Sequence, residues 1–414
     1  MNIKLLLVSI GILSLLIVSV GVFIILNKNT PVTPNTKLWK VESIDTMKYS
    51  RDTAREYATD HTFDVEIDQT MADIHATGAT HVGIGTPYDP EFIPYLTRWV
   101  DAARRQNLNV WFRGNFSGWE GWFEYKKISR EDHKLLLSEF LRANPGLFKD
   151  GDIISPCPEC ENGGAGDPRS TGDVIGFRQF LIDETAIADA SFKKIGVSVA
   201  ANYHSMNGDV ARLVMDKATT KKLGGIIVVD HYVSTPAQLA SSIDDFARSS
   251  GGKVILGEFG APIPDLNGDL NEEQQAAWIE QALLLLAQKK NLVGLNYWVN
   301  RGGSTALWND DGTPRKAVQS LSNYYKPTYI TIRVVDQSGS FVSAKATVAG
   351  REYKTDSQSL LHIPLVSGSK VLVSSKNNQA SEITLSKDSN NTTIVFNIKK
   401  ENFLDYLIKL LQLT

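Results

Sequence analysis

The hydrophobic pattern of residues 39–326 alternates between short apolar runs and longer segments with helical spacing. Residues 254–256 are apolar without interruption, which is typical of a strand that is buried on both faces. Residues 276–289 instead repeat their apolar positions with the period of a helix, after a capping-box pattern at Asn271 and Gln274. Such alternation predicts repeated strand–helix units around a parallel sheet.

Eight strand–helix units can be placed in this part of the chain. We expect strands at 41–47, 80–87, 109–113, 152–156, 194–200, 225–229, 254–256 and 292–298. The helices are expected at 65–76, 91–105, 130–143, 174–190, 211–221, 236–248, 276–289 and 315–325. This number of units and about 250 residues plus insertions fit a (β/α)8 TIM barrel. A doubly wound sheet is the alternative, but no glycine-rich phosphate turn follows the first strand.

The pattern changes at Pro327, where short runs of alternating polarity begin. They lie at 329–335, 344–348, 360–365, 370–374 and 393–398, and predict a small antiparallel β-sandwich over 327–400. The text I-T-I-R-V-V-D-Q-S-G at 330–339, followed by A-K-A-T-V-A-G and K-T-D-S, resembles carboxypeptidase-regulatory-like modules. This part carries few aromatic residues, so we expect a spacer or docking role rather than sugar binding. Residues 401–414 form an amphipathic tail that is too short to span a membrane.

Residues 5–26 are uncharged and apolar, and long enough to cross a bilayer core of about 30 Å as a helix. A cleaved signal peptide is the alternative, in which case the protein would be secreted. No small-x-small cleavage site follows, and the apolar core is too long for a signal peptide. We therefore expect a membrane anchor in 1–27, followed by a linker with two prolines at 28–38.

Composition excludes several classes of function. The net charge of -3 provides no basic face for nucleic acid. The G-x-S-x-G, H-E-x-x-H and phosphate-loop motifs are absent from the sequence. Cys157 and Cys160 are the two cysteines; a zinc site would need two further ligands, and a redox motif would open a helix. No metal or cofactor is expected, and the sequence leaves the state of the two cysteines open.

Polar and aromatic residues follow the expected strands, at the end where barrels build their active sites. They are Arg113, Glu159, Glu161, Asn202, Tyr203, His231, Tyr232, Glu258 and Trp298, with Trp119 and Trp122 in the loop after the third strand. Two carboxylates that face each other across a barrel mouth suit glycoside hydrolysis. Aromatic side chains nearby would supply flat apolar surfaces for sugar rings.

Structural interpretations compete with these functional ones. Glu258 could be a buried carboxylate paired with an arginine or lysine, and His231 a hydrogen-bonded core histidine. Trp298 could be barrel packing. Arg113 could orient a carboxylate or merely form an ion pair at the rim.

The motifs G-E-F-G after the seventh strand, H-Y after the sixth and N-Y-W after the eighth resemble those of clan A retaining glycoside hydrolases. The closest resemblance is to the family 5 cellulase-like barrels, over 39–326. It implies that Glu258 is the nucleophile and Glu159 the acid/base. It further implies that His231 and Tyr232 hold the nucleophile and that Trp298 is a sugar platform.

The chain departs from that pattern at Pro158, where the family usually has an asparagine before the acid/base. Asn162 follows Glu161 instead, so Glu161 is the alternative acid/base. The resemblance implies a retaining, endo-β-glucanase or mannanase-like hydrolase of β-linked glycans. We expect it to be a monomer, held at the cell membrane with the barrel outside the cytoplasm. A catalytically silent carbohydrate-binding or adhesion protein on the same barrel is the alternative.

Overall fold

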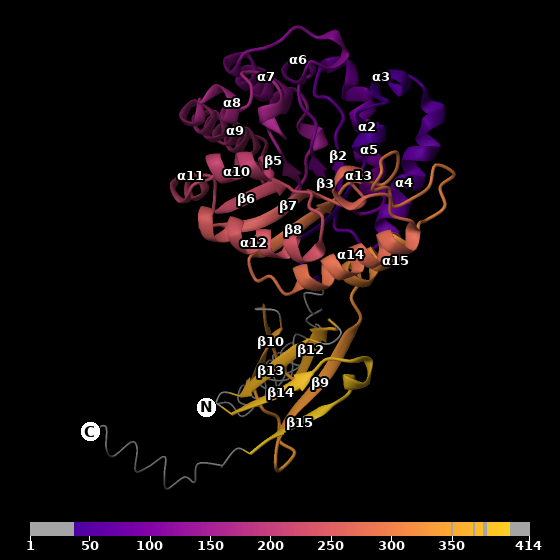
Figure 1. Ribbon diagram of the computed structural model, residues 1–414, viewed down its shortest axis with the longest axis vertical. Coiled ribbons are helices and arrows are strands. Elements are labelled where there is room, and N and C mark those ends of the chain that lie inside the picture. Colours follow the sequence, from indigo (N-terminus) through magenta and orange to yellow (C-terminus); the bar gives the residue numbers. More distant parts are fainter. Residues whose placement is uncertain (1–36, 349–350, 367–368, 376–378, 398–414) are drawn as a thin grey trace, which may run out of the picture.

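The computed structural model describes residues 37–348, 351–366, 369–375 and 379–397, and its larger part is a barrel of parallel strands (Figure 1). The sheet order is β4-β3-β2-β1-β8-β7-β6-β5. The strands are β1 Val41–Asp45, β2 His81–Ile84, β3 Asn109–Phe112, β4 Ile153–Ile154, β5 Ser205–Asn207, β6 Ile226–Asp230, β7 Lys253–Phe259 and β8 Leu292–Tyr297.

A short segment next to β5 closes this sheet into a ring. The amide of Ile154 donates to the carbonyl of Ala200 over 2.9 Å, and the amide of Ala200 donates to the carbonyl of Asp152 over 3.0 Å. Five residues further on, β5 pairs with β6. Two segments therefore fill the position between β4 and β6: the one at Ala200 is bonded to β4, and β5 is bonded to β6. The closed ring is a (β/α)8 barrel and rules out the doubly wound sheet, which has two free edges.

The predicted fifth strand at 194–200 is wrong. Helix α9 continues to Ile195, and the strand that pairs with β6 is Ser205–Asn207. The sequence Ser-Met-Asn has no apolar run, whereas residues 195–200 have the composition of a strand. The position of β5 depends on its hydrogen-bond partners, which its own residues do not reveal.

The helices surround the barrel (Figure 1). They are α2 Met47–Ser50, α3 Ala54–Tyr57, α4 Asp64–Ala76, α5 Ile93–Arg105, α6 Ser117–Glu120, α7 Arg130–Ala143, α8 Pro168–Thr171, α9 Val174–Ile195, α10 Gly208–Val214, α11 Lys217–Lys222, α12 Pro236–Ser250, α13 Pro264–Asn267, α14 Glu272–Ala287 and α15 Lys316–Tyr325. The capping box at Asn271 and Gln274 begins α14, as the sequence predicted.

The barrel interior is filled with side chains rather than open. Its buried residues form one apolar cluster: Val41, Trp111, Ile153, Tyr203, Val228 and Ile255. Bulky residues of this kind pack in layers between the strands and leave no pore. Any cavity must therefore lie at an end of the barrel, above this packed layer.

The C-terminal strands form two smaller sheets with an apolar core of their own. The first sheet contains β10 Ala344–Val348, β11 Arg351–Lys354, β13 Lys370–Ser375 and β14 Ala380–Thr384; the second contains β9 Tyr329–Asp336, β12 Leu360–Pro364 and β15 Thr393–Phe396. The prediction of a wholly antiparallel sandwich is wrong, because β15 pairs with β9 in parallel. The resemblance to carboxypeptidase-regulatory-like modules stays a prediction.

These sheets contact the amino-terminal ends of the barrel strands. The guanidinium of Arg351 donates to the carbonyls of Ala287 and Leu292, over 3.3 and 3.4 Å. Leu292 is the first residue of β8. The opposite, carboxyl end of the barrel is therefore clear of this contact.

The predicted membrane anchor and the predicted C-terminal tail both lie outside the described residues. Among the helices that are described, none has the length and hydrophobicity needed to cross a membrane.

Candidate active site

Arg113 lies at the centre of the carboxyl end of the barrel, directly after β3, with a side chain that is 0% exposed. Its Nε lies 2.9 Å from Oδ2 of Asp45 at the end of β1. Its Nη2 donates to Oε1 of Glu258 in β7 over 2.6 Å. A buried charge is costly unless it is paired. The ion pairs with Asp45 and Glu258 meet that cost, so Arg113 does not form a solvent-exposed rim ion pair.

Asp45 has further donors that hold it in place. Its Oδ1 accepts from the amide of Met47 over 2.7 Å, and its Oδ2 accepts from Nδ2 of Asn296 in β8 over 3.0 Å. These two hydrogen bonds fix the carboxylate of Asp45, which in turn orients Arg113 toward Glu258.

Glu258 is held at both carboxylate oxygens. Arg113 binds Oε1, and the hydroxyl of Tyr232 donates to Oε2 over 2.8 Å. Burial raises the pKa of Glu258 to about 7, although Arg113 and the Tyr232 hydrogen bond both act to lower it. The carboxylate plane is thus fixed, with the group close to ionisation at neutral pH.

Glu159 lies in a tight loop after β4. Its backbone is left-handed, with φ 43° and ψ 45°, and a disulfide joins Cys157 to Cys160 on either side of it. Its amide donates to the carbonyl of Ser205 at the start of β5 over 2.8 Å. Burial, with the neighbouring charge of Glu161, raises the pKa of the Glu159 carboxyl. The loop therefore holds an acid that retains its proton more strongly than a free glutamate.

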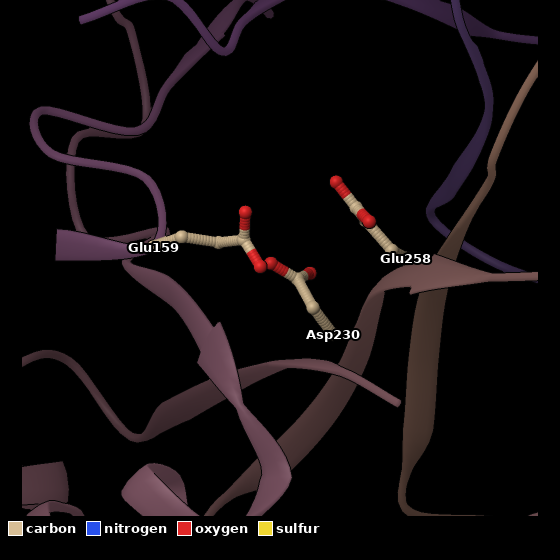
Figure 2. Close-up of side chains that lie close together, drawn as sticks. All are labelled: Glu159, Asp230 and Glu258. Atoms are coloured by element: carbon tan, nitrogen blue, oxygen red, sulfur yellow. The ribbon is translucent and has the colours of Figure 1, made fainter. Parts of the chain in front are cut away.

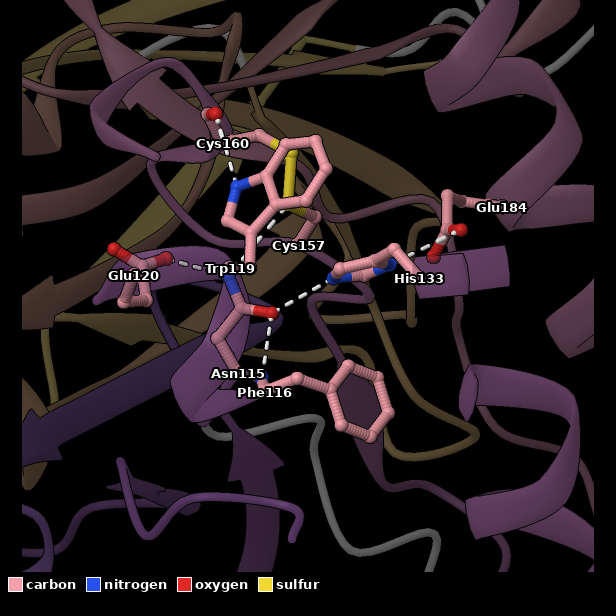
Figure 3. Close-up of a disulfide and its surroundings, with 8 residues drawn as sticks. All are labelled: Asn115, Phe116, Trp119, Glu120, His133, Cys157, Cys160 and Glu184. Carbon is pink, nitrogen blue, oxygen red and sulfur yellow. Dashed lines mark hydrogen bonds and ion pairs between the residues drawn. A yellow bond between two sulfur atoms is a disulfide. The ribbon is translucent and has the colours of Figure 1, made fainter. Parts of the chain in front are cut away.

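The disulfide loop rests on a buried aromatic and polar layer (Figure 3). The indole of Trp119 donates to the carbonyl of Cys160 over 3.2 Å, and its ring stacks on Phe180 at 5.2 Å. Trp119 is 2% exposed, so the prediction that this tryptophan offers a sugar platform has no surface to support it. Its contacts instead support the loop that carries Glu159.

A polar chain runs through the same layer. His133 lies 3.2 Å from a carboxylate oxygen of Glu184 and 2.8 Å from Oδ1 of Asn115. Nδ2 of Asn115 donates to Glu120 over 2.5 Å. Burial raises the pKa of Glu120 to about 8. Glu120 also lines a cavity at this end of the barrel. It lies in helix α6 and does not follow a strand, so the sequence analysis did not select it.

Three carboxyl groups converge at the mouth of the barrel (Figure 2). Glu159, Asp230 and Glu258 each place one oxygen so that the three lie within 4.8 Å of one another. Carboxylates at this spacing can bind a divalent cation in other proteins. Here the guanidinium of Arg113 already pairs with Glu258, so we assign the cluster to proton chemistry.

Asp230 is the member of this cluster that sequence reasoning missed. The motif Asp-His-Tyr drew attention to His231, the residue after the strand. Strand side chains alternate between faces, and Val228 points into the barrel. The same alternation directs the side chains of Asp230 and Tyr232 toward the barrel interior and that of His231 away from it. This two-residue period is the feature of the sequence that could have identified Asp230.

His231 accordingly lies away from the carboxyl of Glu258. Its ring meets Phe246 of α12 edge-on at 5.2 Å, and burial lowers its pKa to about 4. Its amide donates to the carbonyl of Glu258 over 3.0 Å, which is a strand contact. No described side-chain contact joins His231 to the carboxyl group of Glu258, so its position matches the structural interpretation.

Glu161 lies on the same loop as Glu159 but has different partners. One of its oxygens accepts from the amide of Asn207 over 2.7 Å and from its side chain over 3.2 Å. Glu161 is not among the three carboxyls that converge. Asn207 ends β5, and sequence reasoning missed it because the fifth strand was misplaced.

Asn202 and Tyr203 do not lie at the rim, so that prediction is wrong. Nδ2 of Asn202 donates to the carbonyl of Leu223, ahead of β6, over 2.8 Å. Tyr203 packs in the barrel interior, edge-on to Trp111 at 5.6 Å. Both positions follow from the shift of β5 by several residues along the chain.

Two other tryptophans do border the site. Trp298 is half-buried, edge-on to Tyr232 at 6.2 Å, and the ammonium of Lys48 lies 5.8 Å from its ring. Trp122 is half-buried as well, with the guanidinium of Arg51 at 4.9 Å from its ring. A cavity of about 260 Å³ lies beside Trp122, and its lining residues are Met47, Arg51, Arg113, Glu120, Trp122, Pro158, Glu159 and Asn162.

No protein-family model matches the chain, and no curated protein sequence matches it. Among solved structures, GH5_18 from Streptomyces cattleya in complex with GlcNAc is similar, with TM-score 0.52 and 16% identity over 72% of this chain and 84% of that one. GH5_18 from Bifidobacterium longum subsp. infantis gives TM-score 0.49 at 16% identity, over 72% of this chain and 84% of that one.

Bacteroides uniformis β-glucuronidase 3 gives TM-score 0.44 at 12% identity, over 81% of this chain. This chain spans only 47% of the length of that protein. At such identities a structural similarity shows the fold alone. The Streptomyces cattleya structure supports the assignment of a (β/α)8 barrel.

Replacing Arg113 with methionine should destabilise the protein by about 3–5 kcal/mol, because it leaves buried carboxylates without their cation. Arg113 lowers the pKa of Glu258, so its loss raises that pKa further above the unfolded value. A raised carboxyl pKa stabilises the fold at low pH and penalises it as pH rises. We therefore expect a larger deficit at pH 8 than at pH 5, measured by urea unfolding.

Arg105→Met is the matched control, because Arg105 pairs with Asp68 on the surface, where both side chains are more than half exposed. An exposed pair contributes about 0–1 kcal/mol. Equal losses in the two variants would contradict the central role of Arg113.

Proposed function

We propose that the protein is a retaining glycoside hydrolase that cleaves β-linked glycans by double displacement. Glu258 is the nucleophile and Glu159 the acid/base. The observation that carries this proposal is the fixed carboxylate of Glu258, bound by Arg113 and Tyr232, with an oxygen of Glu159 within 4.8 Å. Retaining enzymes separate their two carboxyl groups by about 5–5.5 Å, and inverting enzymes by about 6.5–9.5 Å.

In the first step, an oxygen of Glu258 attacks the anomeric carbon and the glycosidic C–O bond breaks. The proton of the Glu159 carboxyl passes to the departing oxygen, which leaves as an alcohol. Glu258 becomes a glycosyl ester and Glu159 a carboxylate. Arg113 and Tyr232 hold the Glu258 carboxylate in place, which limits the reorganisation that the attack requires.

In the second step, a water molecule takes the place of the alcohol. Glu159 removes one of its protons while its oxygen bonds to the anomeric carbon, and the ester bond to Glu258 breaks. Both carboxyl groups return to their starting states. The raised pKa of Glu159, which results from burial and from Glu161, supports its role as the acid.

The substrate class rests on the surroundings of these groups. Trp122 lines the cavity and Trp298 lies beside Tyr232, and both would offer apolar faces to sugar rings. The cavity of about 260 Å³ is smaller than typical ligand pockets of roughly 300–1,000 Å³, which favours short glycans or chain ends. Endo-β-glucanase-like and mannanase-like activity are both included in the proposal. The GlcNAc bound by the similar structure adds GlcNAc-containing oligosaccharides to the substrates worth testing.

The first test is hydrolysis of β-glucan, mannan, xylan and their oligosaccharides by wild type and by three variants. Glu258→Gln should abolish turnover, because the amide cannot form the glycosyl ester. Glu159→Gln should lower kcat on unactivated substrates by about 10²–10⁴, the usual contribution of a general acid. Product release is measured by reducing-sugar assay and chromatography.

Glu161→Gln is the matched control, since Glu161 lies on the same loop and binds Asn207. It should retain turnover wherever Glu159 is protonated, and should differ from wild type only in a basic limb that begins at lower pH, because the charge of Glu161 raises the pKa of Glu159. Unchanged turnover in Glu258→Gln would reject the nucleophile. A loss confined to Glu161→Gln would transfer the acid role to Glu161, and binding without hydrolysis by wild type would favour a carbohydrate-binding protein.

A second test is the pH profile of kcat/KM. The nucleophile must be ionised, and burial raises the pKa of Glu258 to about 7. Activity should therefore rise as Glu258 ionises near pH 7, and it should fall where Glu159, whose pKa burial also raises, loses its proton. A profile that is flat between pH 5 and 8 would contradict these two roles.

We also propose that the barrel lies outside the cytoplasm, held by the N-terminal segment. Disulfides persist in oxidising compartments and are rare in the cytosol, and Cys157 is bonded to Cys160. Alkylation of intact cells followed by non-reducing peptide mapping should recover these cysteines as one linked peptide. Recovery of both as alkylated thiols would contradict this location.

A further inference from the structure

Asp230, the third carboxyl group of the site, has no role in the mechanism described above. It ends β6, is 3% exposed, and neither carboxylate oxygen has a hydrogen-bond partner among the described residues. A buried carboxylate without donors is costly in its ionised form. Such a group either holds a proton or shares one with a neighbour.

The neighbouring strand leaves room for Asp230. Gly257 lies beside it in β7, and a Cβ atom at Gly257 would come within 2.3 Å of Oδ1 of Asp230. Any larger residue at this position would collide with the carboxyl group. The glycine therefore allows Asp230 to occupy the barrel mouth next to Glu258.

The cation of the site is already committed to other groups. Arg113 lies 2.6 Å from Glu258 and 2.9 Å from Asp45, whereas its closest approach to Asp230 is 3.8 Å. One guanidinium thus faces Asp45, Glu258 and Asp230, with Glu159 close by. The negative charges exceed the positive charge if all four carboxyl groups ionise.

Other charged and titratable groups surround Asp230 and Glu159, and more of them are acidic than basic. Those that act on Asp230 or Glu159 are Asp45 from β1, Arg51 after α2, Arg113 after β3, Glu120 from α6, Glu161 from the disulfide loop, Tyr232 after β6 and Glu258 from β7. Arg51 is paired with Asp52 at 2.7 Å, which reduces its effect on Glu159.

Figure 2 shows the carboxyl groups of Glu159 and Asp230 pointing toward one another. Their closest oxygens lie within 4.8 Å. Two carboxyl groups this close cannot both ionise without a large penalty, so one proton remains on the pair.

We propose that Asp230 and Glu159 share one proton. Asp230 is then a positioning residue that keeps Glu159, the proposed acid/base, protonated near neutral pH. This inference rests on the proposed function and adds a third carboxyl group to it. Burial and the neighbouring charges of Glu258 and Glu159 raise the pKa of Asp230 well above its ordinary value, which agrees with a retained proton.

The charges balance through the reaction. In the first step the shared proton leaves with the alcohol, and the pair gains one negative charge. Glu258 loses its negative charge at the same moment because it becomes an ester. Arg113 is then free to compensate Asp230, from which it is 3.8 Å away. In the second step the proton taken from water returns to the pair.

The test compares wild type with Asp230→Asn, which keeps the shape and removes the charge. Without the neighbouring carboxylate, Glu159 should lose its proton at lower pH. We expect the basic limb of kcat/KM on an unactivated glycoside to move down by about one pH unit, or roughly tenfold lower kcat/KM at pH 8. Dinitrophenyl glycosides release dinitrophenolate, a leaving group that needs no proton from the acid. The kcat/KM of Asp230→Asn on these substrates should therefore stay near the wild-type value.

Asp209→Asn is the matched control, because Asp209 is largely exposed and should change neither limb. An unmoved basic limb in Asp230→Asn, with Glu159→Gln still impaired, would overturn the inference. Equal losses on both substrates at every pH would mean a merely structural role and would also overturn it.

A readout that needs no substrate separates this inference from the proposed function. Infrared difference spectra at pH 8 should show one protonated carboxyl group in wild type that Asp230→Asn lacks. An unchanged carboxyl band would overturn the shared proton. Wild type that hydrolyses no glycoside yet shows this band would overturn the proposed hydrolase and leave the proton pair supported.

Discussion

The buried guanidinium of Arg113 is the constraint on which the carboxyl end of the barrel depends. A cation with a side chain 0% exposed must be paired within the protein, and its partners come from β1 and β7. Asp45 and Glu258 therefore have to approach the same point from strands that are far apart in sequence. The closed ring of strands makes that approach possible, and the donors from Met47 and Asn296 keep Asp45 in place.

The same constraint sets the chemistry of the pocket. One guanidinium cannot neutralise every carboxyl group that converges there, and burial raises the pKa of Glu159, Asp230 and Glu258. Glu258 has a cation and a tyrosine as hydrogen-bond partners. Asp230 accepts no hydrogen bond from the described residues and lies 3.8 Å from Arg113, and the roles proposed for Glu258 and Glu159 rest on these different surroundings.

Most of the barrel could be predicted from sequence because its strands are apolar runs with helices between them. Arg113, Tyr232, Glu258 and Trp298 were expected at the rim and lie there, since each follows or ends a clear strand. Asn202 and Tyr203 were not, because β5 has no apolar run of its own. Hydrogen bonds to β6 fix the position of β5, and the three residues Ser205–Asn207 do not by themselves reveal that partner.

Periodicity and hydrophobicity are local properties of the chain, so they predict both the barrel and the position of Glu258 near the end of a buried strand. The groups that Glu258 faces depend instead on how distant segments pack together. The left-handed, disulfide-closed loop directs Glu159 rather than Glu161 to the cluster, where it meets Asp230 of β6 and Glu258 of β7. Those choices depend on distances between distant segments, and charge compensation at Arg113 exists only once the ring has closed.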